Sequence, residues 1–306
     1  MVQNRSTYAS WDGLEAILLV GRHGTVRAAA EAVGVAHTTL ARRIAAAERE
    51  LGITAFVKSV KGYVPTEEGE IVIERAGKMA FEASVMAKSL DTADQPLAGS
   101  VRVSLSSTIL THIVAPMLSE FHTRYPGIEL VFDIADTLVD LDRRDADVVL
   151  RMQQAPAPDL VGRRIGQVHV AAYQHIGSEH DRSVNQDCVP VIGWGDPRQV
   201  HQAFSRLGIE NFQIVASTPD IAAQVALSAA YKAVLELPCY VGDTLKQLRR
   251  VSDVAYGFSE LWCLTHTSLR ASRRVRAVTD FLSEGLSVHR GLIEGGGRDA
   301  AKTELA

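Results

Sequence analysis

Residues 11–51 repeat their hydrophobic positions with the period of an α-helix and predict three short helices. The first spans about residues 11–20 and is expected to pack beneath the other two. Those two lie on either side of a tight turn at residues 33–36, where Gly34 can turn the chain without steric cost. The apolar positions of the three helices are Leu14, Ile17, Leu18, Val26, Ala29, Ala30, Val33, Leu40, Ile44 and Ala47.

The third helix carries polar side chains between its apolar positions. They are His37, Thr38, Thr39, Arg42 and Arg43. A small helix-turn-helix with donors on its exposed face has the geometry that enters the major groove of DNA. Arginine can pair there with guanine, and threonine can touch a thymine methyl or a phosphate. Two alternatives stay open: an ordinary helix pair with a solvated charged face, and an Arg43 that pairs with Glu48 or Glu50 instead.

Residues 56–65 contain β-forming valines around a Lys61-Gly62 turn and predict a small hairpin, or wing. Lys58 and Lys61 could reach phosphate or the minor groove, which would position the protein without reading sequence. Residues 1–65 hold eight basic and five acidic side chains, a balance of +3, whereas the remainder carries −7. Because +3 is a modest excess, one copy would bind DNA weakly, and two or more copies are expected to act together.

A longer helix is predicted after Pro65, with Thr66 as its N-cap and Glu67 and Glu68 in its first turn. From there, apolar residues recur at alternating spacings of four and three, which is a heptad seam. We expect this seam to join two copies, so that the recognition helix of each copy contacts one of two half-sites. The alternative is a helix that packs on its own domain. The seam residues are Val72, Ala76, Met79, Ala83, Met86 and Leu90.

Beyond a polar break at residues 92–99, expected to be a hinge, strand patterns alternate with amphipathic helix patterns. This alternation predicts a parallel α/β sheet. The tail from Gly295 has few apolar residues and is expected to be disordered. The expected strands are 101–105, 128–134, 147–151, 167–173, 189–193, 214–216 and 261–265, and the expected helices are 109–124, 137–144, 197–207, 219–231 and 272–285.

The composition narrows the class of protein. A length of 306 residues suffices for two domains, and 46% apolar with 22% charged residues is typical of a soluble globular protein. Residues 1–10 lack an apolar signal core and no apolar run could cross a bilayer, so we expect a cytoplasmic protein. Cys188, Cys239 and Cys263 are expected to be small buried hydrophobes, with a redox switch as the alternative. No catalytic or metal-binding motif is present, so we expect neither an enzyme nor a resident metal or cofactor.

The order of these parts resembles the LysR-type transcriptional regulators, over about residues 10–285. One departure is Ala36, where the family commonly has a serine that would cap the reading helix. Another is the sequence AAYK at residues 229–232, where a glycine-rich turn is usual. The resemblance rests on Ala28–Ala30, Leu40–Ile44, Glu50–Gly52 with Phe56, Gly62–Gly69, Phe121–Pro126, Arg144–Arg151 and Leu261–His266.

The resemblance implies an N-terminal all-α winged helix-turn-helix with a long linker helix, and a C-terminal α/β effector-binding domain of two subdomains, like a type 2 periplasmic binding protein. It also implies a homodimer or homotetramer on double-stranded promoter DNA with an inverted repeat, with RNA polymerase as a further candidate partner and no membrane contact. The expected boundaries are 1–65 for the winged helix-turn-helix, 66–91 for the linker and dimerisation helix, 92–99 for the hinge, 100–290 for the effector domain and 291–306 for the tail. Within the effector domain, the expected subdomains are about 100–165 with 265–290, and about 166–264.

The turn at residues 106–108 lies where a strand ends and a helix begins, a place where backbone N–H groups and the helix dipole bind anions. Simple capping of the helix at 109–124 is the alternative. We expect a small organic effector, anionic in character, between the subdomains; a solute-binding or enzymatic α/β protein dimerised by its N-terminal helices is the competing hypothesis. The candidate residues are Ser106, Ser107 and Thr108 from this turn and, from the resemblance, Thr137, Ser217 and Thr218.

Overall fold

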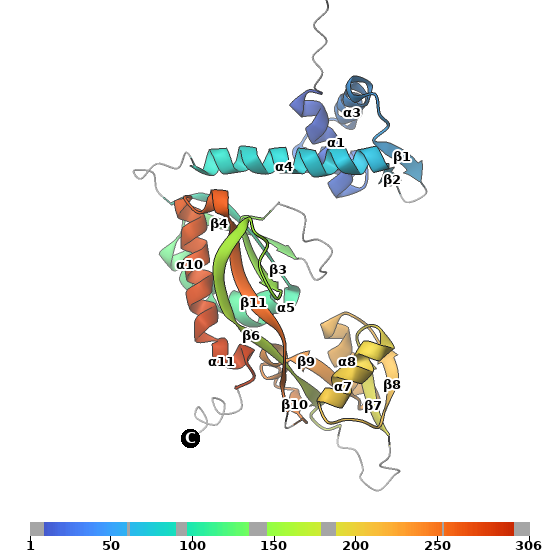
Figure 1. Cartoon of the computed structure of the whole chain (residues 1–306), viewed down its shortest axis with the longest axis vertical. Helices are drawn as coiled ribbons and strands as arrows, with labels where there is room; N and C mark the ends of the chain where they lie inside the picture. Colours follow the sequence, from blue (N-terminus) through green and yellow to red (C-terminus); the bar gives the residue numbers. More distant parts are fainter. Residues whose placement is uncertain are drawn as a thin grey trace, which may run out of the picture. The chain divides into compact units, whose positions relative to one another are not determined.

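The computed structural model of the chain describes residues 9–59, 62–89, 97–134, 146–178, 188–252 and 254–296. They form two compact units (Figure 1). The first unit comprises the described residues up to 89, and the second comprises those from 97 onward. The predicted order of a helical N-terminal region followed by an α/β region is confirmed.

The first unit contains a cluster of three helices, a hairpin and a long helix. They are α1 (Trp11–His23), α2 (Val26–Val33), α3 (His37–Leu51), β1 (Phe56–Ser59), β2 (Gly62–Pro65) and α4 (Glu67–Ser89). Hydroxyl groups cap the first two helices, because Ser10 accepts a hydrogen bond from the Gly13 N–H and Thr25 accepts one from the Ala28 N–H. Gly34 ends α2 with a φ of 69°, as the predicted tight turn requires.

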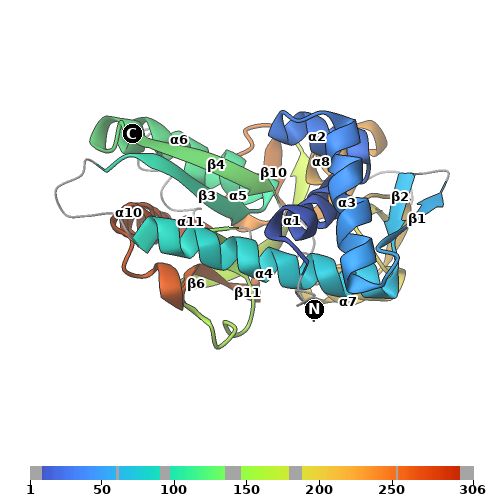
Figure 2. The same ribbon diagram turned by 90° about the horizontal axis from the view of Figure 1, so that it is seen from above.

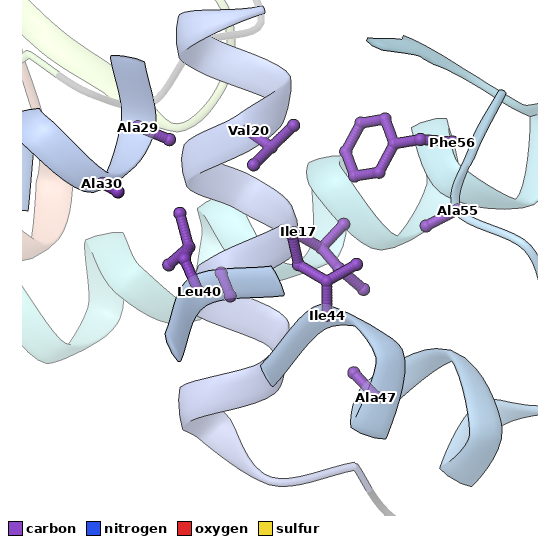
Figure 3. Packing of buried hydrophobic residues seen from close by; sticks show 10 residues of the cluster. Ile17, Val20, Ala29, Ala30, Leu40, Ile44, Ala47, Ala55 and Phe56 are labelled. Atoms are coloured by element: carbon purple, nitrogen blue, oxygen red, sulfur yellow. The ribbon is translucent and has the colours of Figure 1, made fainter. Parts of the chain in front are cut away.

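The three helices and the hairpin share one apolar core, in which Ile17 and Leu40 are fully buried (Figure 3). Helices α1 and α3 approach closely at Gly13, where a Cβ atom would lie 2.8 Å from the Cβ of Ala47. A larger side chain at position 13 would force the two helices apart, since a packed interior has no room to absorb it. This core therefore fixes the orientation of α3.

The hairpin is tied to the same cluster. Tyr63 donates its backbone N–H to the carbonyl of Gly24 at the end of α1, at 3.1 Å, and its ring meets Phe56 edge-on. The Thr66 hydroxyl accepts a hydrogen bond from the Gly69 N–H and donates one to the Thr54 carbonyl. The predicted N-cap at Thr66 is thus confirmed, and it joins the hairpin to the start of α4.

The predicted heptad seam divides into two parts along α4, which runs as one long rod (Figure 2). Ala76 is buried and Val72 packs against the core of the unit, so this end of the seam is used within the chain. Met79 and Met86 are 48% and 64% exposed, and Ala83 between them is exposed as well. Leu90 lies outside the described residues. The part of the seam that is exposed on a single chain is therefore shorter than the sequence pattern predicts.

The second unit is built on a nine-stranded sheet. Its strands are β3 (Gly99–Leu105), β4 (Ile128–Ile134), β5 (Val148–Met152), β6 (Leu160–His175), β7 (Val189–Gly193), β8 (Phe212–Ser217), β9 (Val234–Pro238), β10 (Leu248–Arg250) and β11 (Tyr256–His266). The order is β4-β3-β5-β11-β6-β9-β7-β8, with β10 paired to β6. β3 is parallel to β4 and β5, and β7 is parallel to β8 and β9, but β6 and β11 are antiparallel to their neighbours. The sheet is mixed, which corrects the expectation of a parallel sheet.

The two long strands β6 and β11 connect two subdomains. Leu261–Thr265 of β11 pair with β5 in the first subdomain, and Val170–Gln174 of β6 pair with β9 in the second. Residues 261–265 belong to the sheet of the first subdomain. The chain therefore passes from the second subdomain to the first before residue 261 of β11, a few residues ahead of the boundary at 264/265 that the sequence suggests. A register shift between Gly257 and Ser259 marks this stretch of β11.

Helices flank the strands of both subdomains (Figure 1). They are α5 (Ser107–Ile109), a π-helical turn η1 (Leu110–Val114), α6 (Ala115–Arg124), α7 (Pro197–Arg206), α8 (Ile221–Tyr231), α9 (Cys239–Gly242), η3 (Thr267–Leu269), α10 (Arg273–Val288) and α11 (Arg290–Ile293). The predicted helix at 109–124 therefore contains a π turn, and the one at 137–144 lies outside the described residues. Lys232 ends α8 with a φ of 50°, in place of the usual glycine-rich turn.

The start of the C-terminal tail is ordered. Ile293 is fully buried, and the carbonyl of Gly295 accepts a hydrogen bond from Nη1 of Arg250 at 3.1 Å. The expectation of disorder from residue 291 is therefore wrong for residues 291–296, because α11 and two hydrogen-bonded glycines follow α10. Residues 297–306 lie outside the described part of the chain.

Candidate DNA-binding and effector-binding sites

The N-terminal half of α3 presents polar side chains on the surface of the first unit. His37, Thr38 and Arg42 are exposed, and Thr39 is half-buried. The backbone of Ala36 begins the helix without any side-chain cap, as its sequence predicts. The N–H of Thr39 donates to the carbonyl of Ala36 at 2.9 Å, and no side chain of the N-cap residue accepts from the start of the helix.

Arg43 is held by a neighbouring helix. Its Nη2 lies 3.2 Å from Oδ2 of Asp12 in α1. The alternative partners suggested by the sequence are otherwise engaged: Glu48 accepts from the Ala55 N–H and Glu50 accepts from the Ser10 N–H. The alternative in which Arg43 pairs with Glu48 or Glu50 is therefore wrong, because a helix adjacent in space supplies a carboxylate that spacing along α3 cannot reveal.

The wing carries one described lysine. Lys58 in β1 is exposed and lies opposite Tyr63 in the register of the hairpin. Lys61 lies outside the described residues. Gly62 has a φ of 117°, and a Cβ there would lie 2.9 Å from the carbonyl oxygen of Gly24. This close approach keeps the wing next to the helix cluster that carries α3.

In the second unit, the turn at 106–108 is a helix cap. The Ser106 hydroxyl accepts a hydrogen bond from the Ile109 N–H, as the capping alternative predicts, and lies 3.2 Å from the Thr108 hydroxyl. Ser107 and Thr108 line a cavity of about 430 Å³ between the α5–η1 segment and the start of α8. Ser217 and Thr218 lie just before α8, where the Thr218 hydroxyl accepts from the Asp220 N–H, and neither lines this cavity. Thr137 lies outside the described residues.

Two hydrogen bonds join the subdomains beside this cavity. The Thr108 hydroxyl lies 2.9 Å from the Tyr240 hydroxyl, and Nδ1 of His112 lies 2.8 Å from the Thr244 hydroxyl. Burial lowers the pKa of His112, which favours the neutral imidazole in this contact. Thr108 in α5 and His112 in the π turn both contact the α9 segment, and sequence analysis missed these contacts because the partners are 132 residues apart.

A second, more apolar cavity of about 280 Å³ lies between the end of β5 and the start of α8. The carboxylate of Glu236 in β9 lines it and accepts two hydrogen bonds, from Nε1 of Trp194 at 2.9 Å and from the Tyr256 hydroxyl at 2.6 Å. Burial raises the pKa of Tyr256, so its hydroxyl stays a donor. Sequence analysis did not single out these three residues, which come from three different segments.

The cysteines do not favour a redox switch. Cys239 and Cys263 are buried free thiols, as expected, whereas Cys188 is exposed, which corrects the expectation for that residue. Burial raises the pKa of Cys239, and it raises that of Cys263 to about 11. Burial therefore disfavours the thiolate of both side chains, which is the reactive form.

Within the described residues, no helix combines the length and the apolar character needed to cross a membrane. In the same part of the chain, no group of three or more His, Cys, Asp or Glu residues is arranged to hold a metal ion.

The first unit contains a helix-turn-helix held by an apolar core, a wing and a long helix, and the second is an α/β unit of two subdomains. Together they define a DNA-binding regulator with a ligand-binding domain. Comparison with known families agrees: the LysR substrate binding domain matches residues 94–287, and the bacterial regulatory helix-turn-helix protein of the lysR family matches residues 11–70. The chain belongs to the LysR family of transcriptional regulators.

Individual relatives carry the same description. The HTH-type transcriptional regulator DmlR of Escherichia coli (strain K12) is 32% identical over 152 residues, a match that spans half of each chain. The Mau operon transcriptional activator of Paracoccus denitrificans is 25% identical over 90% of this chain and 96% of its own. A full-length OxyR variant of Pseudomonas aeruginosa shares the fold, with a TM-score of 0.63 at 16% identity over 92% of this chain and 98% of its own. The predicted fold class and family are thereby confirmed.

Proposed function

We propose that the chain binds promoter DNA with an inverted repeat as a homodimer, and that a small molecule between the two subdomains of the second unit controls this binding. The observation that carries the proposal is the polar surface of α3, where His37, Thr38 and Arg42 are exposed on a helix fixed by an apolar core. Thr39 and Arg43 extend this surface, and Lys58 of the wing is proposed to contact phosphate. In this arrangement, α3 reads base edges in the major groove.

Charge supports a dimer as the DNA-binding form. One N-terminal segment carries +3, and two copies would double that excess over the same stretch of duplex. A symmetric pair also matches an inverted repeat, because a two-fold axis relates both the half-sites and the reading helices.

The experiment is a mobility-shift titration of the full chain with duplexes from the region upstream of its own gene. We expect a shifted complex whose affinity falls by at least about tenfold between roughly 50 and 200 mM salt, because bound phosphates release counterions. An unshifted duplex, or an affinity that is flat with salt, would contradict the proposal.

The proposed dimer surface is the open strip of α4 formed by Met79, Ala83 and Met86. Replacing Met86 by glutamate would set two like charges against each other across the two-fold axis, and we expect the dissociation constant of the dimer to rise by at least about tenfold. Sedimentation velocity over a range of concentrations measures this. The matched control is Val288→Glu, which adds the same charge at an almost fully exposed apolar position of α10. Equal dissociation constants for both variants would exclude this strip as the dimer surface.

The proposed effector site lies between the two subdomains. Support comes from the cavities beside Ser107, Thr108 and Glu236, and from the hydrogen bonds that join Thr108 to Tyr240 and His112 to Thr244. A ligand that binds one arrangement of the subdomains more tightly than another shifts the population toward it. Such a shift can pass to the first unit through the chain that joins them.

A further inference from the structure

We infer that the effector is a small amine, whose ammonium group pairs with Glu236 and whose compact apolar body fills the cavity beside it. This inference rests on the proposed function, because it assumes an effector between the subdomains. It departs from the anionic effector that the turn at residues 106–108 predicts, and it follows from the chemistry of the cavity lining.

The size of the cavity limits the ligand. Its volume of about 280 Å³ falls just under the range of roughly 300–1,000 Å³ that is usual for ligand pockets. Its walls are mostly apolar and come from both subdomains: Met152 ends β5 in the first, whereas Val170, Pro219 and Ile221 belong to the second. A body of about one ring or one short branched chain would fill this cavity.

Among the described residues, Glu236 is the one charged residue that lines this cavity, and it is 7% exposed. Its two carboxylate oxygens each accept a hydrogen bond from a neutral donor, Trp194 on one and Tyr256 on the other. Indole Nε1 can only donate, and a distance of 2.6 Å to the Tyr256 hydroxyl is typical of an O–H group bonded to a charged oxygen. Both oxygens of Glu236 are therefore engaged as acceptors.

Among the described residues, the Glu236 carboxylate forms no ion pair, and a buried carboxylate of this kind favours a cationic ligand. The guanidinium of Arg206 lies over the ring of Tyr256, 5.4 Å from the centroid, and does not line the cavity. An anion entering the cavity would lose its hydration and meet a like charge, whereas an ammonium group would gain an ion pair. The lining therefore selects against carboxylates and for amines.

Aromatic side chains strengthen this selection. Trp194 lines the cavity, and so does Phe258, which is 59% exposed although it is a large apolar residue. Phe258 lies at the register shift between Gly257 and Ser259 in β11. Aromatic faces attract ammonium groups, most strongly where water is excluded. Phe258 is thus placed to cover a bound amine, which would explain an exposed phenylalanine at this position.

The test compares three ligands that share one ring and differ in charge: benzylamine, benzyl alcohol and benzoate, each titrated into the full chain by isothermal calorimetry at neutral pH. We expect saturable binding of benzylamine, at least about tenfold tighter than that of benzoate, because a hydrogen-bonded charge pair is worth about 1.5–3 kcal/mol. Tighter binding of benzoate, or no saturable binding of benzylamine, would overturn the inference.

Two variants locate the binding. Glu236→Gln keeps a polar side chain for Trp194 and Tyr256, and we expect it to lose benzylamine affinity by about tenfold or more. The matched control is Glu284→Gln, which removes the same charge from an exposed position on α10 and should leave affinity unchanged. Phe258→Ala provides a second probe that does not disturb the core, with an expected loss of about threefold or more from the missing aromatic face. Unchanged benzylamine affinity in both Glu236→Gln and Phe258→Ala would refute this site.

The mobility-shift experiment distinguishes failure of the amine hypothesis from failure of the proposed DNA-binding function. Wild-type and Glu236→Gln proteins should bind operator DNA equally well without ligand, since Glu236 belongs to the second unit. If the wild-type protein binds operator DNA but does not bind benzylamine, the amine hypothesis is rejected and the proposed regulator function stands. If the wild-type protein does not bind DNA, the proposed function itself is rejected.

Discussion

Replacing Arg42 with alanine is expected to lower operator affinity by about 2–6 kcal/mol per dimer, because each reading helix loses a base contact worth about 1–3 kcal/mol. Arg42 is exposed on α3 and forms no ion pair among the described residues, whereas Arg43 is drawn toward Asp12. Arg42 is therefore the cation that can turn fully toward DNA. A mobility-shift titration at one fixed salt concentration measures the loss.

Arg198→Ala is the matched control for this prediction. The Arg198 side chain is almost fully exposed on α7, and its ion pair among the described residues is with nearby Asp196, so its removal takes away the same charge from the second unit. We expect operator affinity within about threefold of the wild type, since isolated surface ion pairs contribute little. If Arg42→Ala and Arg198→Ala bind operator equally well, α3 does not read the DNA through Arg42.

The second large effect concerns stability. Arg250→Met is expected to lower the free energy of unfolding by about 3–5 kcal/mol, because it leaves the carboxylate of Asp243 buried without its cation. The two side chains are 9% and 14% exposed, with Nη2 of Arg250 2.5 Å from Oδ2 of Asp243. Tyr173 donates its hydroxyl to the other oxygen, but a phenol has no cationic form and cannot supply the missing positive charge. Urea unfolding followed by circular dichroism measures the change.

A double variant separates the charge from the packing. Arg250→Met with Asp243→Leu removes both members of the pair, and we expect it to recover more than half of the stability that the single variant loses. The recovery should be incomplete, because the Tyr173 hydroxyl loses its acceptor. A single variant that unfolds at the same urea concentration as the wild type would show that this ion pair does not stabilise the second unit.

The first unit could be predicted closely because its signals are local. The spacing of Leu40, Ile44 and Ala47 defines the buried face of α3, and Thr25 and Gly34 mark where α2 begins and ends. Each of these depends on residues within one or two helical turns of one another. The seam of α4 was predicted only in part, because periodicity reveals an apolar face without revealing that Ala76 is covered by the same chain.

Strands of the second unit were harder to predict. β9 is buried almost throughout, so its sequence VLELP lacks the alternation that identifies a half-buried strand. The first half of β6 was not predicted for a different reason. Arg163 and Arg164 are exposed there, and two adjacent charged residues are typical of a loop. The mixed topology depends on the pairing of β11 with both β5 and β6, which no local pattern encodes.

The candidate effector site could not be assembled from the sequence because its members are far apart. Glu236 meets Trp194 across 42 residues and Tyr256 across 20. Thr108 was singled out as a ligand residue, yet its hydroxyl is paired with Tyr240 from the other subdomain. The ends of predicted helices and strands indicate where polar groups gather. The partners of these groups depend on the order in which the strands pack, which the sequence pattern does not predict.

The π-helical turn at Leu110–Val114 has a consequence for how this protein can change in length. A π turn holds one residue more than the α-helical turn it replaces. Deleting a single amino acid here would restore a regular α-helical turn, and because that turn completes the same rotation with one residue fewer, Thr108 would keep its angular position relative to α6. The hydrogen bond from Thr108 to Tyr240 at the junction of the subdomains would then be retained. A one-residue deletion at the exposed Thr111 should therefore be tolerated better than one inside the regular helix α6, where it would rotate the preceding residues by about 100°.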